Sequence, residues 1–274
     1  MEQFTASTWE ETILDGIAKS RHRDGRLKAD LIRKIAALKS RAGCDSFPTG
    51  VDQLAHAVGI HRIRYVPLAI TGRLVREPRG LVAEINTDLS PRDRRFVLAH
   101  EVAHLILERD AINSASQRLQ RAGQSTGLGY KQVESLCDYG AREILLPAAS
   151  LRAELKKHKP DLKVVSAIAD EAQCSAEVVA GRICEPFGPW EGISFLWWKF
   201  GERGAEIVEI IPSSAALVEL ADEHNSLSRR ALFTSSVVAG HETIWVGTGP
   251  RCFSAQALHI AQQQVMMLAA PRVD

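Results

Sequence analysis

The chain carries almost no excess charge of either sign: 34 Lys and Arg stand against 33 Asp and Glu, leaving a formal charge of +1. Proteins whose main task is to bind the phosphate backbone of nucleic acids usually carry a clear positive excess. The composition therefore argues against DNA or RNA as the primary partner and leaves only a local basic patch open.

The sequence also lacks long apolar runs and paired cysteines. No stretch approaches the ~20 apolar residues that a membrane-spanning helix needs, and the first residues are acidic where a secretory signal would be basic. An odd number of widely spaced cysteines without a CxxC pair predicts neither a disulfide framework nor a cysteine-only zinc site: they are Cys44, Cys137, Cys174, Cys184 and Cys252. We expect a cytoplasmic protein with no membrane partner.

The sequence has the composition of a globular protein, since 45% of its 274 residues are hydrophobic. Segments that favour helix and segments that favour strand alternate along it. Apolar residues at helical spacing predict helices over 28–38, 51–58, 131–146, 148–157, 164–184 and 258–268. Alternating or continuous apolar runs predict strands over 60–68, 80–86, 193–200, 205–211 and 243–247. The polar stretch 109–130 is interpreted as a mobile connection.

One helix carries two histidines four residues apart. Ser90 is a good N-cap and Pro91 suits the first helical position, so the helix is expected to run through 96–108. On a helix, His100 and His104 differ by about 40° in direction and by one turn, so both imidazoles reach the same point. That geometry suits a zinc ion with a vacant position for water.

Glu101 lies between the histidines and projects about 100° away from His100. A carboxylate there stays out of the metal's ligand set but is close enough to take a proton from a zinc-activated water and pass it to a leaving amine. Random placement would give the HExxH pattern in about two per cent of such chains, so the motif alone is a hypothesis. The competing interpretation is a pair of polar histidines at the edge of an apolar helix.

A third ligand is expected on the helix 131–146. Glu134 shares a face with Cys137 and Asp138, and Asp138 is placed to accept a ring N–H from one histidine and so fix its tautomer. Glu143 and Glu108 are weaker rivals for the third place. The plain alternative is an exposed acidic stripe with no metal.

The segments 96–108 (FVLAHEVAHLILE) and 132–151 (QVESLCDYGAREILLPAASL) together resemble the ImmA/IrrE family of metallopeptidases. The resemblance covers roughly 47–151 and rests on two motifs in the family's order. It implies an α+β chain with a small zincin-like peptidase domain. It also implies metal ligands at His100, His104 and Glu134, a catalytic Glu101, and zinc, manganese or another divalent ion as cofactor.

The resemblance also implies a function, a gluzincin-like metalloendopeptidase that cleaves a helix-turn-helix transcriptional repressor and so relieves repression in a stress or mobile-element response. Two alternatives stay open: a non-catalytic metal-containing regulator that binds a repressor or DNA, and a toxin or phage-defence protease. Cys137 departs from the family pattern, where a small residue is usual. We expect it to be a small buried residue, although a thiol near zinc can compete as a ligand.

The domain organisation follows from these patterns. We expect an N-terminal helical extension at 1–45, the zincin-like domain at 46–151, a helical helix-turn-helix-like segment at 152–186, and a mixed α/β regulatory or partner-recognition domain at 187–274. In the helix-turn-helix-like segment, the second helix offers only Arg182 to contact base edges. DNA reading is therefore not expected to be its main role.

Overall fold

The computed structural model describes residues 25–44, 48–114, 130–185, 190, 193–201, 204–211, 238–246, 249–261 and 264–271. Helices and strands both contribute, so the chain is α+β. It divides into two compact units, Met1–Leu145 and Leu146–Asp274. The finer division into four segments stays a prediction.

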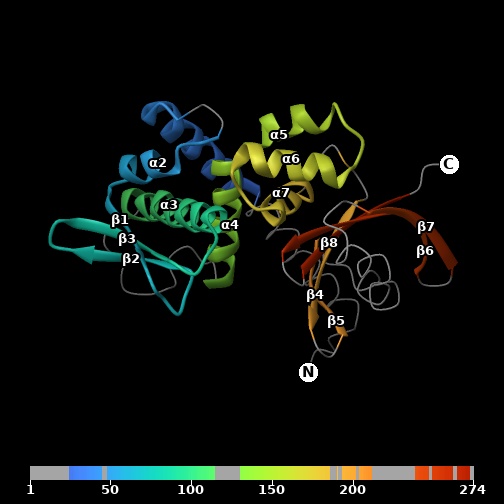
Figure 1. Ribbon diagram of the computed structural model, residues 1–274. Helices are drawn as coiled ribbons and strands as arrows, with labels where there is room; N and C mark the ends of the chain where they lie inside the picture. The colour runs from blue at the N-terminus through green and yellow to red at the C-terminus, as the bar shows by residue number, and fades with distance from the viewer. Residues whose placement is uncertain are drawn as a thin grey trace, which may run out of the picture. The chain divides into compact units, whose positions relative to one another are not determined.

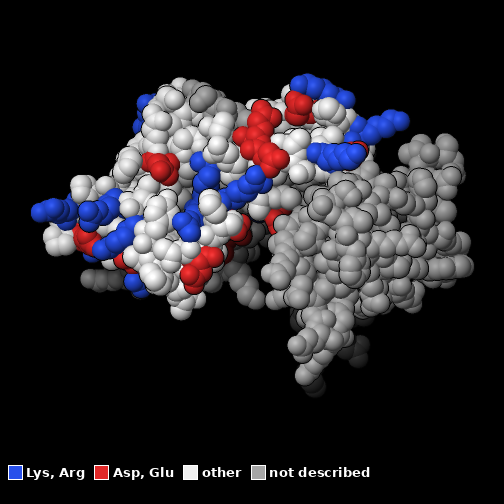
Figure 2. All heavy atoms as spheres, in the orientation of Figure 1, with Lys and Arg blue, Asp and Glu red and all other residues white. Residues whose placement is uncertain are grey.

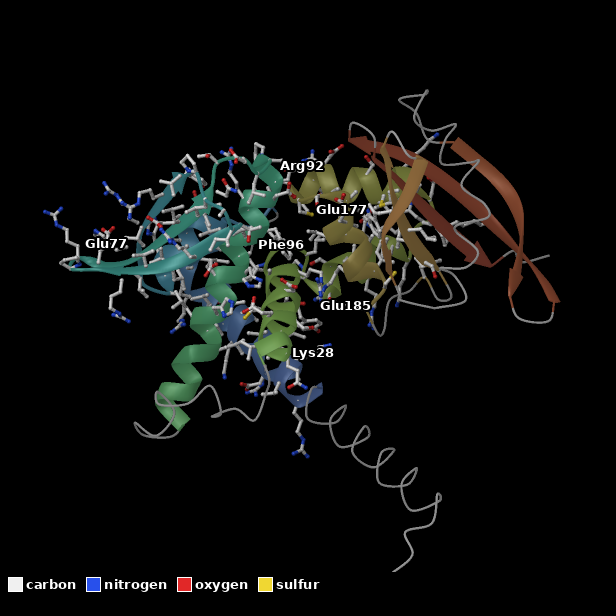
Figure 3. The ribbon with its side chains drawn as sticks, turned by 90° about the horizontal axis from the view of Figure 1, so that it is seen from below. Lys28, Glu77, Arg92, Phe96, Glu177 and Glu185 are labelled. Atoms are coloured by element: carbon white, nitrogen blue, oxygen red, sulfur yellow. The ribbon has the colours of Figure 1, made fainter. Side chains whose placement is uncertain are left out.

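The first unit contains a three-stranded sheet formed by β1 (Ile60–Val66), β2 (Gly72–Glu77) and β3 (Gly80–Asn86). β3 lies in the middle, parallel to β1 and antiparallel to β2, and Glu77 lies at the tip of the hairpin (Figure 3). The strands predicted at 60–68 and 80–86 are confirmed, whereas β2 was missed. With apolar residues only at its centre, β2 gives too weak an alternation to be seen in the sequence.

Helix α3 (Pro91–Ser114) packs on this sheet (Figure 1). The contact is close, since a Cβ built on Gly72 of β2 would lie 2.5 Å from Cγ1 of Val97. The predicted cap is confirmed: the Ser90 hydroxyl accepts the Asp93 backbone N–H at 3.2 Å and donates to the Asp93 carboxylate at 2.6 Å. This fixes where the histidine-bearing helix begins. The helix predicted over 51–58 is confirmed as α2 (Val51–Ala57), and it packs against α3 and β1.

The predicted connection at 109–130 was partly wrong. α3 continues to Ser114, and Tyr130 is the first residue of α4 (Tyr130–Leu145); residues 115–129 lie outside the described part of the chain. An established helix extends at little cost, because each further residue adds a hydrogen bond without a new nucleus. A polar composition alone does not stop it.

A helix over 25–42, longer than the predicted 28–38, lies along α4. Its Leu31 and Ile35 are buried, and the amino group of Lys39, also buried, donates to the Thr49 hydroxyl at 2.9 Å and to the Ile144 carbonyl at 3.1 Å. A cation at the C-terminal end of α4 satisfies a terminal carbonyl and complements the helix dipole. The N-terminal helix thus belongs to the same packed unit as α4.

The second unit begins with three short helices, α5 (Ala148–Leu155), α6 (Leu162–Ala172) and α7 (Ala176–Ile183). The Asp161 side chain caps α6 by accepting the Lys163 backbone N–H at 2.8 Å, and α6 ends at Gln173 in a left-handed conformation. The helix pair predicted over 164–184 is therefore present. Arg182 of α7 is only 4% exposed and donates to the Leu146 carbonyl at 3.2 Å.

The remaining strands form a five-stranded sheet in which every neighbouring pair is antiparallel (Figure 1). Its order is β5-β4-β8-β7-β6. The strands are β4 (Ser194–Gly201), β5 (Gly204–Ile211), β6 (Val238–Val246), β7 (Gly249–Ala261) and β8 (Gln264–Pro271). The strands predicted within 193–200, 205–211 and 243–247 are confirmed.

The closing helix predicted over 258–268 was wrong. Residues 249–261 and 264–271 form an antiparallel pair in which Leu258 lies opposite Met266. Ala, Leu, Met and Gln favour helix locally, but β8 is held between β4 and β7, and Met266 and Leu268 are both buried at the two-residue spacing of a strand. Tertiary pairing therefore overrode local propensity, and the expected mixed α/β character is absent from the described residues beyond 190.

Charge is unevenly distributed over the first unit. Lys and Arg side chains gather over the three-stranded sheet (Figure 2), where Arg62, Arg76 and Arg79 are exposed. Glu84 on the central strand is buried between Arg64 at 2.9 Å and Arg73 at 2.7 Å, and Arg64 also pairs with Glu77 at 2.6 Å, so two carboxylates balance these two arginines. Within the described ranges, no helix is long and apolar enough to cross a membrane.

Candidate active site

The site forms where α3 crosses α4 at very short range. Gly140 of α4 lies at this crossing, where a larger residue would not fit. A Cβ there would lie 2.8 Å from Ala103 Cβ on α3 and 3.1 Å from Leu31 Cδ2 on the helix 25–42. The neighbouring Cys137 and Ala141 are fully buried. Small residues at the crossing bring the polar side chains of the two helices within reach of each other.

Three side chains converge beside this crossing, and they are those that the sequence singled out. His100 Nε2 lies 3.0 Å from His104 Nε2 and 3.3 Å from a Glu134 carboxylate oxygen, while His104 Nε2 lies 3.5 Å from the other Glu134 oxygen. The two imidazole rings meet edge to face with centroids 4.7 Å apart. The two helices therefore deliver two nitrogens and a carboxylate to one point.

The distances between these side-chain atoms can be compared with the distances between the ligands of a bound metal ion. In a tetrahedral zinc site with metal–ligand bonds of 2.0–2.1 Å, the nitrogen and oxygen ligands lie about 3.3 Å from one another. The three observed distances are 3.0, 3.3 and 3.5 Å. The 3.3 and 3.5 Å distances end on the two different Glu134 oxygens, so a small adjustment of the carboxylate would let these residues hold a zinc ion or a similar divalent cation.

Asp138 supports the first histidine from behind. Its carboxylate lies 2.8 Å from His100 Nδ1, which leaves His100 Nε2 directed at Glu134. Burial lowers the pKa of His100, but the hydrogen bond and charge of Asp138, together with the charges of Glu101 and Glu134, more than offset this, so that the pKa is raised above its ordinary value. The contact is the one that orients metal-binding histidines and increases their basicity.

Glu101 is only 8% exposed and follows His100 directly on α3. Of the two rivals to Glu134, Glu143 comes nine residues later on α4, which turns its side chain about 180° away from Glu134. The side chain of Glu108 lies outside the described residues. Glu134 is therefore the better third ligand among the carboxylates on α4.

Cys137 is a second candidate for the third metal ligand beside the two histidines. One ligand atom from each of His100, His104 and Cys137 lies within 4.8 Å of the others, and the thiol is fully buried. The two possible third ligands differ in fit, because the Glu134 oxygens already lie within 3.5 Å of both imidazoles. Glu134 and Cys137 are thus the two possible third ligands beside the histidines.

The role of the N-terminal helix, residues 25–42, at this site was not predicted from the sequence. Leu31 touches the α3–α4 crossing, Lys39 caps α4, and the ammonium of Lys28 lies 4.9 Å from the centre of the Tyr139 ring. An amphipathic pattern shows that a helix is half buried, but not which helix it packs against. Its role in holding α4 is visible only in the fold.

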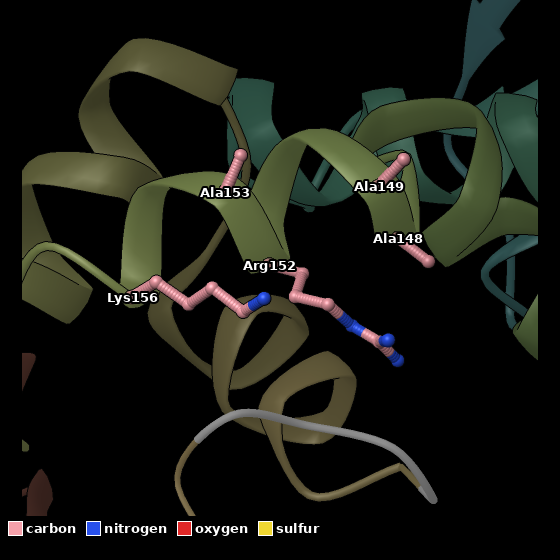
Figure 4. A pocket seen from close by; sticks show the side chains of 5 residues that line it. All are labelled: Ala148, Ala149, Arg152, Ala153 and Lys156. Atoms are coloured by element: carbon pink, nitrogen blue, oxygen red, sulfur yellow. The ribbon is translucent and has the colours of Figure 1, made fainter.

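The second unit has a hollow of its own, a cavity of about 480 Å³ along α5. Its lining side chains are Ala148, Ala149, Arg152, Ala153 and Lys156 (Figure 4). None of them is a metal ligand or a general base at neutral pH. This cavity therefore does not compete with the histidine cluster as a catalytic site.

Asp138→Asn tests the electrostatics of the cluster. We expect metal affinity at neutral pH to fall by about 10–100-fold. A histidine must be neutral to bind metal, so affinity falls as the pH drops through the pKa of His100. Because Asp138 raises that pKa, the variant should show this acid-side loss at a lower pH than the wild type. Metal titrations across a pH series measure both effects, and an unchanged midpoint would contradict the assignment.

Comparison with known proteins finds relatives for the segment that carries this site. Residues 58–183 match the model of the IrrE N-terminal-like domain, Peptidase_M78. The radiation response metalloprotease IrrE of Deinococcus deserti is 27% identical over 113 residues, and that of Deinococcus radiodurans is 30% identical over 100 residues. The matches cover 41% and 36% of this chain but only 39% and 30% of the relatives, so well under half of each relative is represented.

A solved structure gives a likeness over a longer span. A Mycobacterium tuberculosis transcriptional regulator superposes with a TM-score of 0.60 over 89% of this chain and 76% of its own, at 15% identity. At that identity the likeness concerns the fold alone. The segment 58–183, which contains both site-bearing helices, is similar to the IrrE N-terminal-like domain, and the matches to that domain and to the two IrrE proteases support an ImmA/IrrE assignment.

Proposed function

We propose that the protein is a zinc-dependent endopeptidase that cleaves a helix-turn-helix transcriptional repressor and so relieves repression in a stress or mobile-element response. The observation that carries the proposal is the convergence of His100, His104 and Glu134 at 3.0–3.5 Å, the spacing of a tetrahedral metal site. The same ligand set can hold manganese or another divalent ion, which is the alternative metal.

His100, His104 and Glu134 would hold the ion, and Asp138 would keep His100 Nε2 aimed at it through the 2.8 Å contact to Nδ1. When bound, zinc lowers the pKa of a water molecule toward about 7 and polarises the scissile carbonyl. Three protein ligands leave one position for substrate or water, as catalytic sites require.

Glu101 would act as the general base and then as the acid. It stands on the same helix as both histidines, turned about 100° from His100, which keeps it out of the ligand set but near the histidines. It accepts a proton from the attacking water and returns it to the leaving amine, which makes amine expulsion possible. Its burial at 8% exposure limits competition from bulk water.

The proposed substrate class rests on the family and on what α7 lacks. Arg182, the one cation of α7 that sequence reasoning considered for base recognition, is buried and donates to the Leu146 carbonyl. This argues against base reading by Arg182 of that helix. The solved structure with a similar fold is titled a transcriptional regulator, which is consistent with a role in transcriptional control but also with a non-catalytic regulator that binds a repressor.

The test is to incubate the purified full chain with a helix-turn-helix repressor encoded next to its gene, with added zinc and, separately, with a chelator. We expect a discrete cleavage product that appears only when metal is present. Binding without cleavage in the presence of stoichiometric metal would favour the non-catalytic regulator. Degradation of unrelated proteins at a similar rate would favour a broad toxin or phage-defence protease.

A further inference from the structure

Cys137 lies on the interior side of the histidine pair. Its thiol is fully buried, whereas the Glu134 side chain on the same helix is 33% exposed. The two residues are three positions apart on α4, about 60° apart around the helix axis. They therefore approach His100 and His104 from different sides, the carboxylate from the solvent side and the thiol from within the protein.

The thiol is close enough for coordination to require only a local adjustment. His100, His104 and Cys137 each offer a ligand atom within 4.8 Å of the other two. With zinc–sulfur and zinc–nitrogen bonds of about 2.3 Å and 2.0–2.1 Å, a sulfur and a nitrogen bound to one tetrahedral ion lie about 3.5 Å apart. A shift on the order of 1 Å in the thiol would cover the difference between 4.8 and 3.5 Å.

The ligand preferences of zinc and similar metals also favour coordination by the Cys137 thiolate. Thiolates are soft ligands that zinc, cobalt and cadmium accept readily beside imidazole. The thiol proton leaves to solvent when the metal binds, so neither an oxidant nor a reductant is needed.

We propose that Cys137 is an additional ligand of this metal centre, its thiolate coordinating from the interior side the ion that His100 and His104 hold. The inference rests on the proposed function only for the two histidines. With Glu134 also bound, the thiolate fills the position that catalysis needs for water. The centre would then have a closed form, and opening it requires the sulfur to leave.

Cobalt substitution tests this directly in the full chain. Metal-free protein is titrated with Co²⁺, and the absorption spectrum is recorded at one equivalent. We expect a sulfur-to-cobalt charge-transfer band in the near ultraviolet together with the visible bands of tetrahedral cobalt. The charge-transfer band should be lost in Cys137→Ala and kept in Cys174→Ala, which removes another fully buried thiol, from the second unit.

The outcomes separate this inference from the proposed function. Stoichiometric cobalt with tetrahedral visible bands but no charge-transfer band in the wild type overturns the role of Cys137 and leaves the metal site intact. Failure to bind cobalt at all overturns both. A band that persists in Cys137→Ala also overturns the assignment, and because the wild-type spectrum is decisive by itself, a misfolded variant does not rescue it.

Discussion

Glu101→Gln is expected to lower the rate of repressor cleavage by about 10²–10⁴-fold, the usual contribution of a general acid–base group. Gln has nearly the same shape but cannot accept the proton of the attacking water. Because Glu101 is not among the proposed ligands, the variant should still bind one equivalent of metal. Cleavage assays and elemental analysis on the same preparation measure the two properties together.

A matched control is Glu143→Gln. Glu143 is as buried as Glu101, at 8% exposure, but lies on α4 about 180° around the helix from Glu134. It carries the same chemical change at the same burial, and it should retain both metal and cleavage. If Glu101→Gln cleaves the repressor at the wild-type rate, the peptidase mechanism is wrong and a binding role for the centre is favoured.

Gly140→Val is expected to have the largest effect on stability. A Cβ at this position would lie 2.8 Å from Ala103 Cβ, and Ala103 has no rotamer through which to move away. The helices must separate, which typically costs about 1–3 kcal/mol when extra carbons enter a packed core. We expect a melting temperature several degrees lower, and weaker metal binding because the ligands come from both helices.

Gly25→Val is the control for this substitution. A Cβ at Gly25, the first described residue of the helix 25–42, meets no atom within 4 Å. The same side chain is thus added where there is space. Thermal unfolding of the two metal-free variants and their zinc affinities should differ clearly. Equal stability of both variants would mean that the crossing at Gly140 has more room than the structure indicates.

Much of the site was predictable from the sequence because the spacing of its residues within each helix is a local property of the chain. The four-residue spacing of His100 and His104 brings two imidazoles together on any helix, and the same spacing puts Glu134 and Asp138 on one face of α4. What remained a hypothesis was the meeting of the two helices. No sequence pattern states that Ala103 faces Gly140, the close contact that sets the 3.3 and 3.5 Å distances to Glu134.

The strands were harder to predict from the sequence than the site residues were. β3 was visible as a run of apolar residues, but β2 was missed and β8 was predicted as part of a helix. β8 pairs with β4, about 70 residues earlier, whereas β2 pairs with the adjacent β3 but has apolar residues only at its centre. Local propensity carries no information about such pairing, and burial between two neighbours can reverse it.

The amino-acid sequence by itself determined the chemistry of this protein: two imidazoles, a carboxylate base and an acidic pair at helical spacing, in the order typical of a metallopeptidase family. Only the tertiary structure decided that these groups converge, that Lys39 and Leu31 hold α4 in place, and that Cys137 faces the histidines from the interior. The reason is physical. Helical phase is fixed by neighbours three or four residues away, whereas the crossing of two helices is fixed by packing across the whole unit.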